Sequence, residues 1–223
     1  MKNVLVIAVH PDDETLGCGG TLLRHKAHGD TVHWLILTRP TAEYGFAPET
    51  AIVQDGVVQK VGSAYQFDSV SHLHFPATGL ADIKQGELIK TVSQKIEEIR
   101  PAIIYIPFHS DIHGDHKTAF QAIHSCTKPF RYTFIEKILM METISETDQA
   151  VVNIATYFSP MVYVDVSKYI DLKLKILSLY ESEIGLPPFP RSLDAIKSLA
   201  RVRGAASNFK YAEAFMLLRE IVR

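Results

Sequence analysis

The sequence predicts an α/β fold in which helices cover both faces of a parallel sheet. Short apolar runs rich in β-branched residues, such as 4–9 and 102–106, are typical of strands that are buried on both faces. These runs alternate with segments whose apolar residues recur at helical spacing. The 223 residues, 47% apolar and 22% charged, suffice for one sizeable core, and we expect a single domain over residues 1–223.

The expected elements follow one another along the whole chain. Strands are expected at residues 4–9, 31–37, 70–73, 102–106, 135–141 and 161–166. Helices are expected at residues 15–28, 49–65, 88–99, 117–126, 169–180 and 193–202. The last segment, 211–222, is expected to form an amphipathic helix that packs on the core. Residues 38–48 are rich in turn formers, so we expect a loop over the active face there.

Charge and composition exclude several classes of protein. The formal net charge is −2, so no excess of positive charge supports binding to nucleic acid. Two cysteines in a chain of this length indicate a reducing compartment. No signal peptide is recognisable, and no window reaches the roughly 18 consecutive apolar residues of a membrane span. We therefore expect a soluble, cytoplasmic protein without a transmembrane segment.

The first polar cluster follows the first strand directly. His10, Asp12, Asp13 and Glu14 lie within five residues, and Pro11 stiffens the exit from the strand. Neighbouring side chains diverge in an extended segment, so one aspartate can bind a metal ion while the other faces the water on that ion. The alternative is that the acids cap the following helix and favour its dipole, which leaves His10 unexplained.

The glycines at 17, 19 and 20, after this cluster, raise the alternative of a phosphate-binding loop. They lack the G-x-G-x-x-G spacing of a dinucleotide fingerprint and the Lys-Ser pair of a Walker motif. We expect instead that they let the helix pack close to the sheet.

A second cluster follows the strand at 102–106. Three histidines and two aspartates lie within residues 109–116. The carboxyl ends of parallel strands meet at one edge of a sheet, so the two clusters are expected to converge. Catalytic zinc sites usually keep three protein ligands and a water. We therefore expect a site built from His10, an aspartate of the first cluster and one histidine of the second, with His116 the best placed because it begins the next helix.

The residues between these ligands have expected roles as well. Asp115 precedes His116 and can orient a neighbouring imidazole by hydrogen bonding. His113 remains as an imidazole near the metal, where it can act as electrophile or general acid.

Together, the motifs His10-Pro11-Asp12-Asp13-Glu14 and His113-Gly114-Asp115-His116 resemble those of the LmbE-like, or PIG-L, family of zinc-dependent N-acetylglucosaminyl deacetylases. The resemblance covers most of the chain and implies a Rossmann-like three-layer α/β/α sandwich with a mostly parallel sheet. Two features depart from the family pattern. Gly114 stands where many members have proline, and no arginine lies between Arg39 and Arg100, where some members hold the substrate with one.

The resemblance also implies roles for individual residues. Asp12 would be the general base, and His113, supported by Asp115, would stabilise the oxyanion or protonate the leaving amine. The substrate would be an N-acetylated sugar, free or linked to a nucleotide or lipid, and the products acetate and a free amine. A homo-oligomer is in keeping with this fold. The residues that would bind the single zinc ion are His10, Asp13 and His116.

Other functions stay open at this level. An amidase acting on a larger acyl group or a non-sugar amide would use the same residues, and other divalent ions suit the same ligands. A metal-binding or carbohydrate-binding protein without turnover would not need Asp12 beside the ligands. A nucleotide-dependent Rossmann enzyme would need nucleotide affinity. Contacts to sugar hydroxyls or a phosphate are candidate roles for Arg39, Glu142, Arg191 and Arg203, and Tyr211 to Phe215 are a candidate wall of the pocket.

Overall fold

A computed structural model of the chain describes residues 1–151, 153 and 156–222. The described part contains a seven-stranded sheet with the order β3-β2-β1-β4-β5-β7-β6. Its strands are β1 (Asn3–Ala8), β2 (Thr31–Arg39), β3 (Ser69–Pro76), β4 (Ile103–Pro107), β5 (Lys137–Met141), β6 (Val162–Asp165) and β7 (Ala212–Glu220). Its helices are α1 (Asp13–Ala27), α2 (Pro48–Tyr65), α3 (Gln85–Ile99), α4 (Gly114–Ser125), α5 (Ile170–Leu177) and α6 (Leu193–Ser207), with 3₁₀ turns η1 (Ala42–Tyr44) and η2 (Leu80–Asp82).

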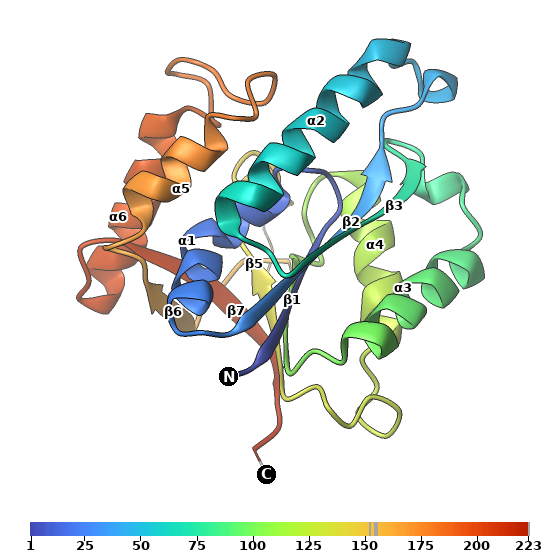
Figure 1. Cartoon of the computed structure of the whole chain (residues 1–223). Coiled ribbons are helices and arrows are strands. Elements are labelled where there is room, and N and C mark those ends of the chain that lie inside the picture. Colours follow the sequence, from blue (N-terminus) through green and yellow to red (C-terminus); the bar gives the residue numbers. More distant parts are fainter. Residues whose placement is uncertain (152, 154–155, 223) are drawn as a thin grey trace.

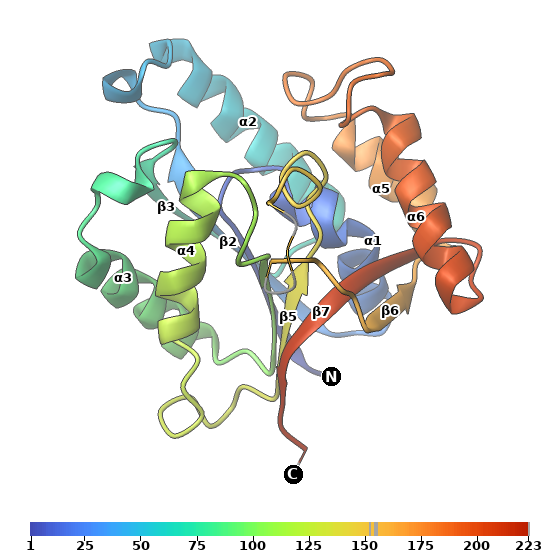
Figure 2. The ribbon, with the colours of Figure 1, turned by 180° about the vertical axis from the view of Figure 1, so that it is seen from behind.

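The helices form a layer on each face of the sheet, as predicted. Helices α1, α2, α5 and α6 cover one face, and α3 and α4 cover the other (Figures 1 and 2). In β1, Leu5 and Ile7 pack toward α3 and α4, whereas Val4 and Val6 pack toward α1 and α2. All four side chains are fully buried. This burial on both faces explains why the strand is apolar throughout rather than alternating.

The sheet is mostly parallel, and its topology determines where a ligand can bind. β1 pairs in parallel with β2 on one side and β4 on the other. The chain therefore leaves β1 toward one edge of the sheet, through β2 and β3, and later continues from β4 toward the other edge. Ligands of such sheets bind beyond the carboxyl ends of the strands at this reversal. Both polar clusters predicted from the sequence follow these two central strands.

The prediction of a C-terminal helix at residues 211–222 is wrong, because this segment forms strand β7. It lies between β5 and β6 and is antiparallel to both. Its alanines, leucines and methionine suit a helix in isolation. In the folded chain its backbone forms hydrogen bonds with a strand on each side, and this tertiary pairing outweighs local propensity.

The other elements lie close to their expected positions, with shifted ends. Strand β3 is longer than expected and reaches Pro76, and α6 continues to Ser207. The stretch 38–48, expected as a loop, begins with the end of β2 and contains η1. Within the described residues, no helix combines the length and apolarity that a membrane crossing requires.

Helix α1 is broken at Cys18, where the backbone leaves the helical region (φ −147°, ψ 16°). Beyond the break, the amides of Gly20 and Thr21 donate to the carboxylate of Glu213 on β7, at 2.8 and 2.7 Å. Lys173 of α5 donates to the same carboxylate at 2.7 Å and also to a carbonyl before the break. This buried ion pair supports the half of α1 that carries the first motif.

The glycines of α1 allow the helix to approach the sheet, as expected. A Cβ at Gly17 would lie 2.8 Å from the side chain of Met141 on β5. A Cβ at Gly20 would lie 2.8 Å from Val166, which follows β6. Neither separation is compatible with a normal van der Waals contact, so both positions need the absence of a side chain.

Candidate active site

The first motif forms a tight turn that fixes Asp13. Its carboxylate oxygen Oδ2 accepts hydrogen bonds from the backbone N–H groups of Val9 and His10, both at 2.9 Å. The same oxygen lies 3.4 Å from Nε2 of His116. Burial opposes ionisation, but His116 and the His10 amide outweigh it, so the pKa of Asp13 is well below its usual value. Asp13 is thus a fixed anion at the end of β1.

Asp12 has an unusual backbone conformation, with φ at +142°. Non-glycine residues in such conformations are strained and occur preferentially at functional sites. The strained turn sends the carboxylate of Asp12 to a different partner, Nη1 of Arg191, at 2.9 Å. Burial and the neighbouring Asp13 raise the pKa of Asp12 well above its ordinary value, while Arg191 opposes this rise. The two adjacent aspartates therefore have opposite electrostatic environments.

Glu14 supports this turn from beneath. Its carboxylate accepts hydrogen bonds from the Asp12 amide at 3.2 Å, the Thr15 hydroxyl at 2.5 Å and the Tyr180 hydroxyl at 2.7 Å. The side chain is fully buried, and burial raises the pKa of Glu14 to about 7. It does not line the pocket described below, so its role is to hold the turn.

In the second motif, His113 caps the N-terminus of α4. Its Nδ1 accepts a hydrogen bond from the Asp115 amide at 3.1 Å. Burial, together with His10 and His116, lowers the pKa of His113 to about 4, so the ring is neutral at pH 7. Because Nδ1 is an acceptor, the proton of the neutral ring is on Nε2.

His116 lies in the first turn of α4 and is almost fully buried. Its Nδ1 lies 2.8 Å from Oδ2 of Asp111, whose other oxygen accepts a hydrogen bond from the Thr147 hydroxyl at 2.6 Å. A carboxylate at Nδ1 is the usual partner of a metal-binding histidine, because it fixes the ring and leaves the other nitrogen for the ion. Nε2 of His116 is buried and has no hydrogen-bond partner among the described residues.

The structure brings together the three residues predicted to bind a metal. One donor atom from each of His10, Asp13 and His116 lies within 4.8 Å of the others. His10 also belongs to a second such group, with His113 and Asp115. Two imidazoles and a carboxylate suit zinc and related divalent ions, and the unpartnered Nε2 of His116 fits such a role. We call His10, Asp13 and His116 the metal cluster.

The carboxylate of Asp115 contacts a different imidazole from the one expected. It lies 3.1 Å from Nε2 of His10, whereas His113 is reached only by the Asp115 amide. The carboxylate also accepts hydrogen bonds from the amides of Thr78 and Leu80. Asp115 therefore orients His10 and attaches the segment after β3 to the site.

An open pocket of about 600 Å³, including the space at its mouth, lies beside these residues. His10, Asp12 and His113 of the two motifs line it. It is also lined by four polar residues from α2 and from the loops after β5 and α5. We call these residues the outer wall: Gln54, Glu146, Glu183 and Arg191.

Arg191 joins the outer wall to the first motif. Besides Asp12, its guanidinium donates to Glu146 at 3.2 Å, to Glu183 at 3.3 Å and to the hydroxyl of Ser145 at 2.8 Å. Three segments distant in sequence are thus held by one side chain. Its planar fork suits such a junction better than a lysine would.

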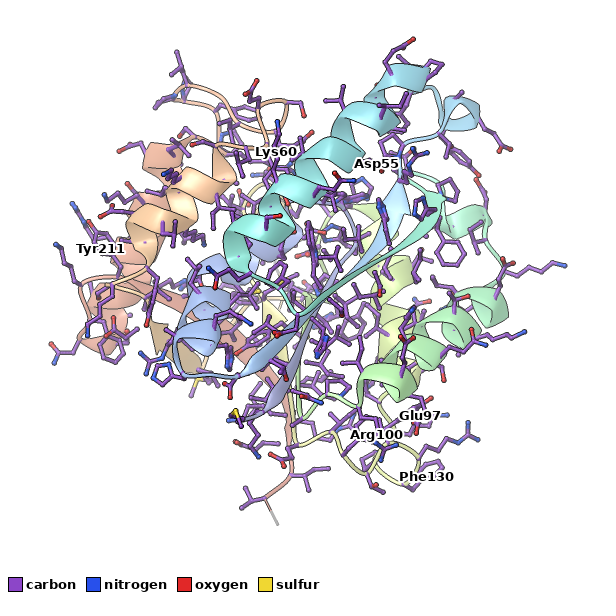
Figure 3. All side chains as sticks on the ribbon, viewed as in Figure 1. Asp55, Lys60, Glu97, Arg100, Phe130 and Tyr211 are labelled. Carbon is purple, nitrogen blue, oxygen red and sulfur yellow. The ribbon has the colours of Figure 1, made fainter. Side chains whose placement is uncertain are left out.

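The other residues that the sequence suggested as substrate contacts do not line the pocket. Arg39 binds Asp55 on α2, at 2.7 Å, and Arg203 binds Glu142 (Figure 3 labels Asp55). In Figure 3, Tyr211 lies on the opposite side of the molecule from Asp55. None of residues 211–215 lines the pocket. Of the four polar residues suggested from the sequence, Arg39, Glu142, Arg191 and Arg203, only Arg191 lines the pocket.

Sequence reasoning assigned no role to several residues that contribute to the site, among them Asp111, Glu146 and Thr147. Asp111 lies within the second polar cluster, residues 109–116, and five residues before His116, so its spacing offered a signal. Glu146 and Thr147 follow β5 in a segment with no recognisable pattern. Only the fold brings them to the carboxyl ends of β1 and β4.

Comparison with known proteins adds to this geometry. The model of the GlcNAc-PI de-N-acetylase family, PIG-L, matches residues 5–127, more than half of the chain. The chain is 26% identical over 221 residues to the diacetylchitobiose deacetylase of Thermococcus kodakarensis, a match covering 96% of this chain and 82% of that protein.

Two solved structures illustrate the likeness of the fold. The conserved protein TT1542 of Thermus thermophilus has a TM-score of 0.77 and 28% identity, with coverage of 100% of this chain and 97% of that one. The 4-carboxy-2-hydroxymuconate hydratase of Pseudomonas putida also has a TM-score of 0.77, at 13% identity, with coverage of 100% and 98%. The hydratase shows a likeness of fold alone, so the reaction has to be argued from side chains.

Proposed function

The chain belongs to the GlcNAc-PI de-N-acetylase (PIG-L) family, and from this membership we propose that it is a zinc-dependent hydrolase acting on an N-acetylglucosamine-type sugar or sugar conjugate. It would release acetate and a free amine. The observation that carries the proposal is a three-donor metal cluster beside a pocket that is lined both by His10 of the cluster and by a separate carboxylate, Asp12. A 26% identical relative that is a diacetylchitobiose deacetylase supports the sugar substrate.

The metal cluster would hold the zinc ion. Hydrogen bonding of His116 Nδ1 to Asp111 leaves Nε2 for the ion, and two amides orient the Asp13 carboxylate. When bound, zinc supplies Lewis acidity that polarises the acyl carbonyl and makes water a better nucleophile at neutral pH. The strongly depressed pKa of Asp13 keeps this ligand ionised at all physiological pH values.

Asp12 is suited to act as the general base. It lines the pocket next to the metal cluster without belonging to it. In the proposed reaction its carboxylate accepts the proton of the water that attacks the acetyl carbonyl. Arg191 binds Oδ2 of Asp12 and so holds the carboxylate in one orientation.

His113 is suited to assist on the other side of the acyl group. Its neutral ring carries the proton on Nε2, because Nδ1 accepts from the Asp115 amide. Nε2–H can donate to the carbonyl oxygen as negative charge develops there, which typically contributes about 3–4 kcal/mol for a well-placed donor. The C–N bond then breaks, and the proton that Asp12 accepted from the water is transferred to the nitrogen, which releases the amine and leaves acetate.

Amine release from a panel of N-acetylhexosamine compounds tests this proposal. The panel contains free, nucleotide-linked and lipid-linked sugars, together with bulkier N-acyl analogues. We expect release by the zinc-loaded protein from the acetylated sugars, and neither release nor bound zinc in His116→Ala. If metal analysis shows that zinc is bound and no compound of the panel releases an amine, the proposed function is contradicted. Preferential release of the bulkier acyl groups would favour an amidase instead.

A further inference from the structure

Two buried oxygen atoms of the outer wall have no hydrogen-bond partner among the described residues. Glu146 is only 8% exposed; its Oε1 accepts from Arg191, but its Oε2 is buried without a partner. Oε1 of Gln54 is buried and unpartnered as well. Both residues line the pocket. Buried polar atoms normally have partners, so these two need an explanation.

Both atoms are acceptors, which restricts what can satisfy them. A carboxylate oxygen and an amide oxygen need a donor such as a hydroxyl or an ammonium group. A phosphate or a carboxylate that is ionised at neutral pH offers only further acceptors. The pocket therefore fits a ligand that presents hydroxyl groups at this position.

The charged side chains around the pocket also favour a ligand that carries hydroxyl groups over an anionic one. Asp12, Glu146 and Glu183 carry three carboxylates, and Arg191 is the sole lysine or arginine that lines the pocket within the described part of the chain. Its guanidinium already contacts all three carboxylates. No lysine or arginine among the described lining residues is left to bind a phosphate, and an anionic group would lie among like charges.

We propose that Glu146 and Gln54 form an acceptor subsite for sugar hydroxyls, and that the substrate carries neither phosphate nor carboxylate on its acylated ring. This inference rests on the function proposed above and narrows its substrate class. The backbone carbonyl of Glu146 accepts a hydrogen bond from the Ile112 amide at 3.1 Å, which holds the subsite against the second motif. The sugar would thus be oriented relative to the metal cluster.

Equilibrium binding tests the proposal independently of turnover. Calorimetric titration of the zinc-loaded protein compares N-acetylglucosamine with its 6-phosphate. We expect the neutral sugar to bind at least about tenfold more tightly, because the phosphate meets unpaired acceptors and like charges. Equal binding of the two, or tighter binding of the 6-phosphate, would overturn the proposal.

Variants locate the effect in the subsite. Glu146→Gln and Gln54→Ala should each weaken binding of N-acetylglucosamine about tenfold, the usual consequence of losing a good acceptor for a sugar hydroxyl. Glu146→Gln should also reduce the discrimination against the 6-phosphate. Glu142→Gln is the matched control, because Glu142 binds an arginine at 2.5 Å but does not line this pocket.

The Gln54 variant keeps the test valid if Glu146→Gln does not fold, since the Gln54 side chain has no hydrogen bond to any residue that the structure describes. Amine release measured in parallel separates the two proposals. Amine release together with unchanged binding of N-acetylglucosamine in both variants would overturn the subsite proposal and leave the proposed function intact. Weaker binding in the variants without release from any N-acetylated sugar would support the subsite and contradict the deacetylase.

Discussion

The metal cluster, whose His10 lines the pocket, and the outer wall of the same pocket are built in different ways. The metal cluster comes from two short motifs at the ends of adjacent parallel strands, and backbone amides or buried carboxylates fix its side chains. The outer wall comes from α2 and two loops, and Arg191 joins the two loops to each other and to Asp12 of the first motif. In the proposed reaction, the rigid strand ends would carry the chemistry, and the loops around them would recognise the substrate.

Removing the proposed base should have the largest effect. Asp12→Asn should lower kcat by about 10²–10⁴-fold, because a positioned general base typically contributes that much. Zinc content should stay unchanged, since Asp12 does not belong to the metal cluster. Steady-state kinetics with metal analysis checks both expectations. Near-normal turnover would remove Asp12 from the mechanism.

Glu14 should make the inner turn sensitive to pH. Its pKa is about 7 in the folded chain, against an ordinary value of 4.5. Its stabilising contribution is therefore complete below pH 4.5 and is lost as the pH rises through 7, a decrease of about 3 kcal/mol in the free energy of unfolding.

Urea unfolding of chelator-treated protein at pH 5 and pH 8 measures this decrease. In Glu14→Gln the neutral amide removes the ionisation, so its stability should change less between the two pH values than that of the unaltered chain. The same change in both proteins would show that Glu14 does not titrate as its burial implies.

Asp111 should tune the metal cluster without binding the ion. Asp111→Asn should weaken zinc affinity by roughly 10–100-fold, as is typical when the carboxylate partner of a ligating histidine is removed. Competition with a chromophoric chelator gives the affinity directly. Unchanged affinity would mean that the fold holds His116 in place without this hydrogen bond.

The smallest effect is expected in the outer wall. Arg191→Lys keeps the charge but loses the planar fork that orients Asp12 and joins the loops, so kcat/KM should fall about tenfold or less. Arg203→Lys is the matched control, because Arg203 also binds a carboxylate with two nitrogens but lies outside this pocket. A loss of bound zinc in Arg191→Lys would mean that the two parts of the pocket are not separate.

Much of the site was predictable because its residues are contiguous and follow apolar strands. The sequence predicts both motifs at one edge of a parallel sheet, and the structure brings His10, Asp13 and His116 together there. The partner of Asp115 was not predictable in the same way. Which imidazole its carboxylate reaches depends on how β1 and α4 face each other, and the structure pairs it with His10.

The alternation of strands and helices and the position of both motifs follow from the amino-acid sequence alone, because burial on both faces and helical periodicity are local patterns. That residues 212–220 form a strand follows only from the fold, since the strands with which they pair, β5 and β6, lie far away in the sequence. The same holds for Glu146 and Arg191, which reach the pocket through long loops. Their roles arise from contacts across 45 and 179 residues of sequence, and no local pattern encodes such contacts.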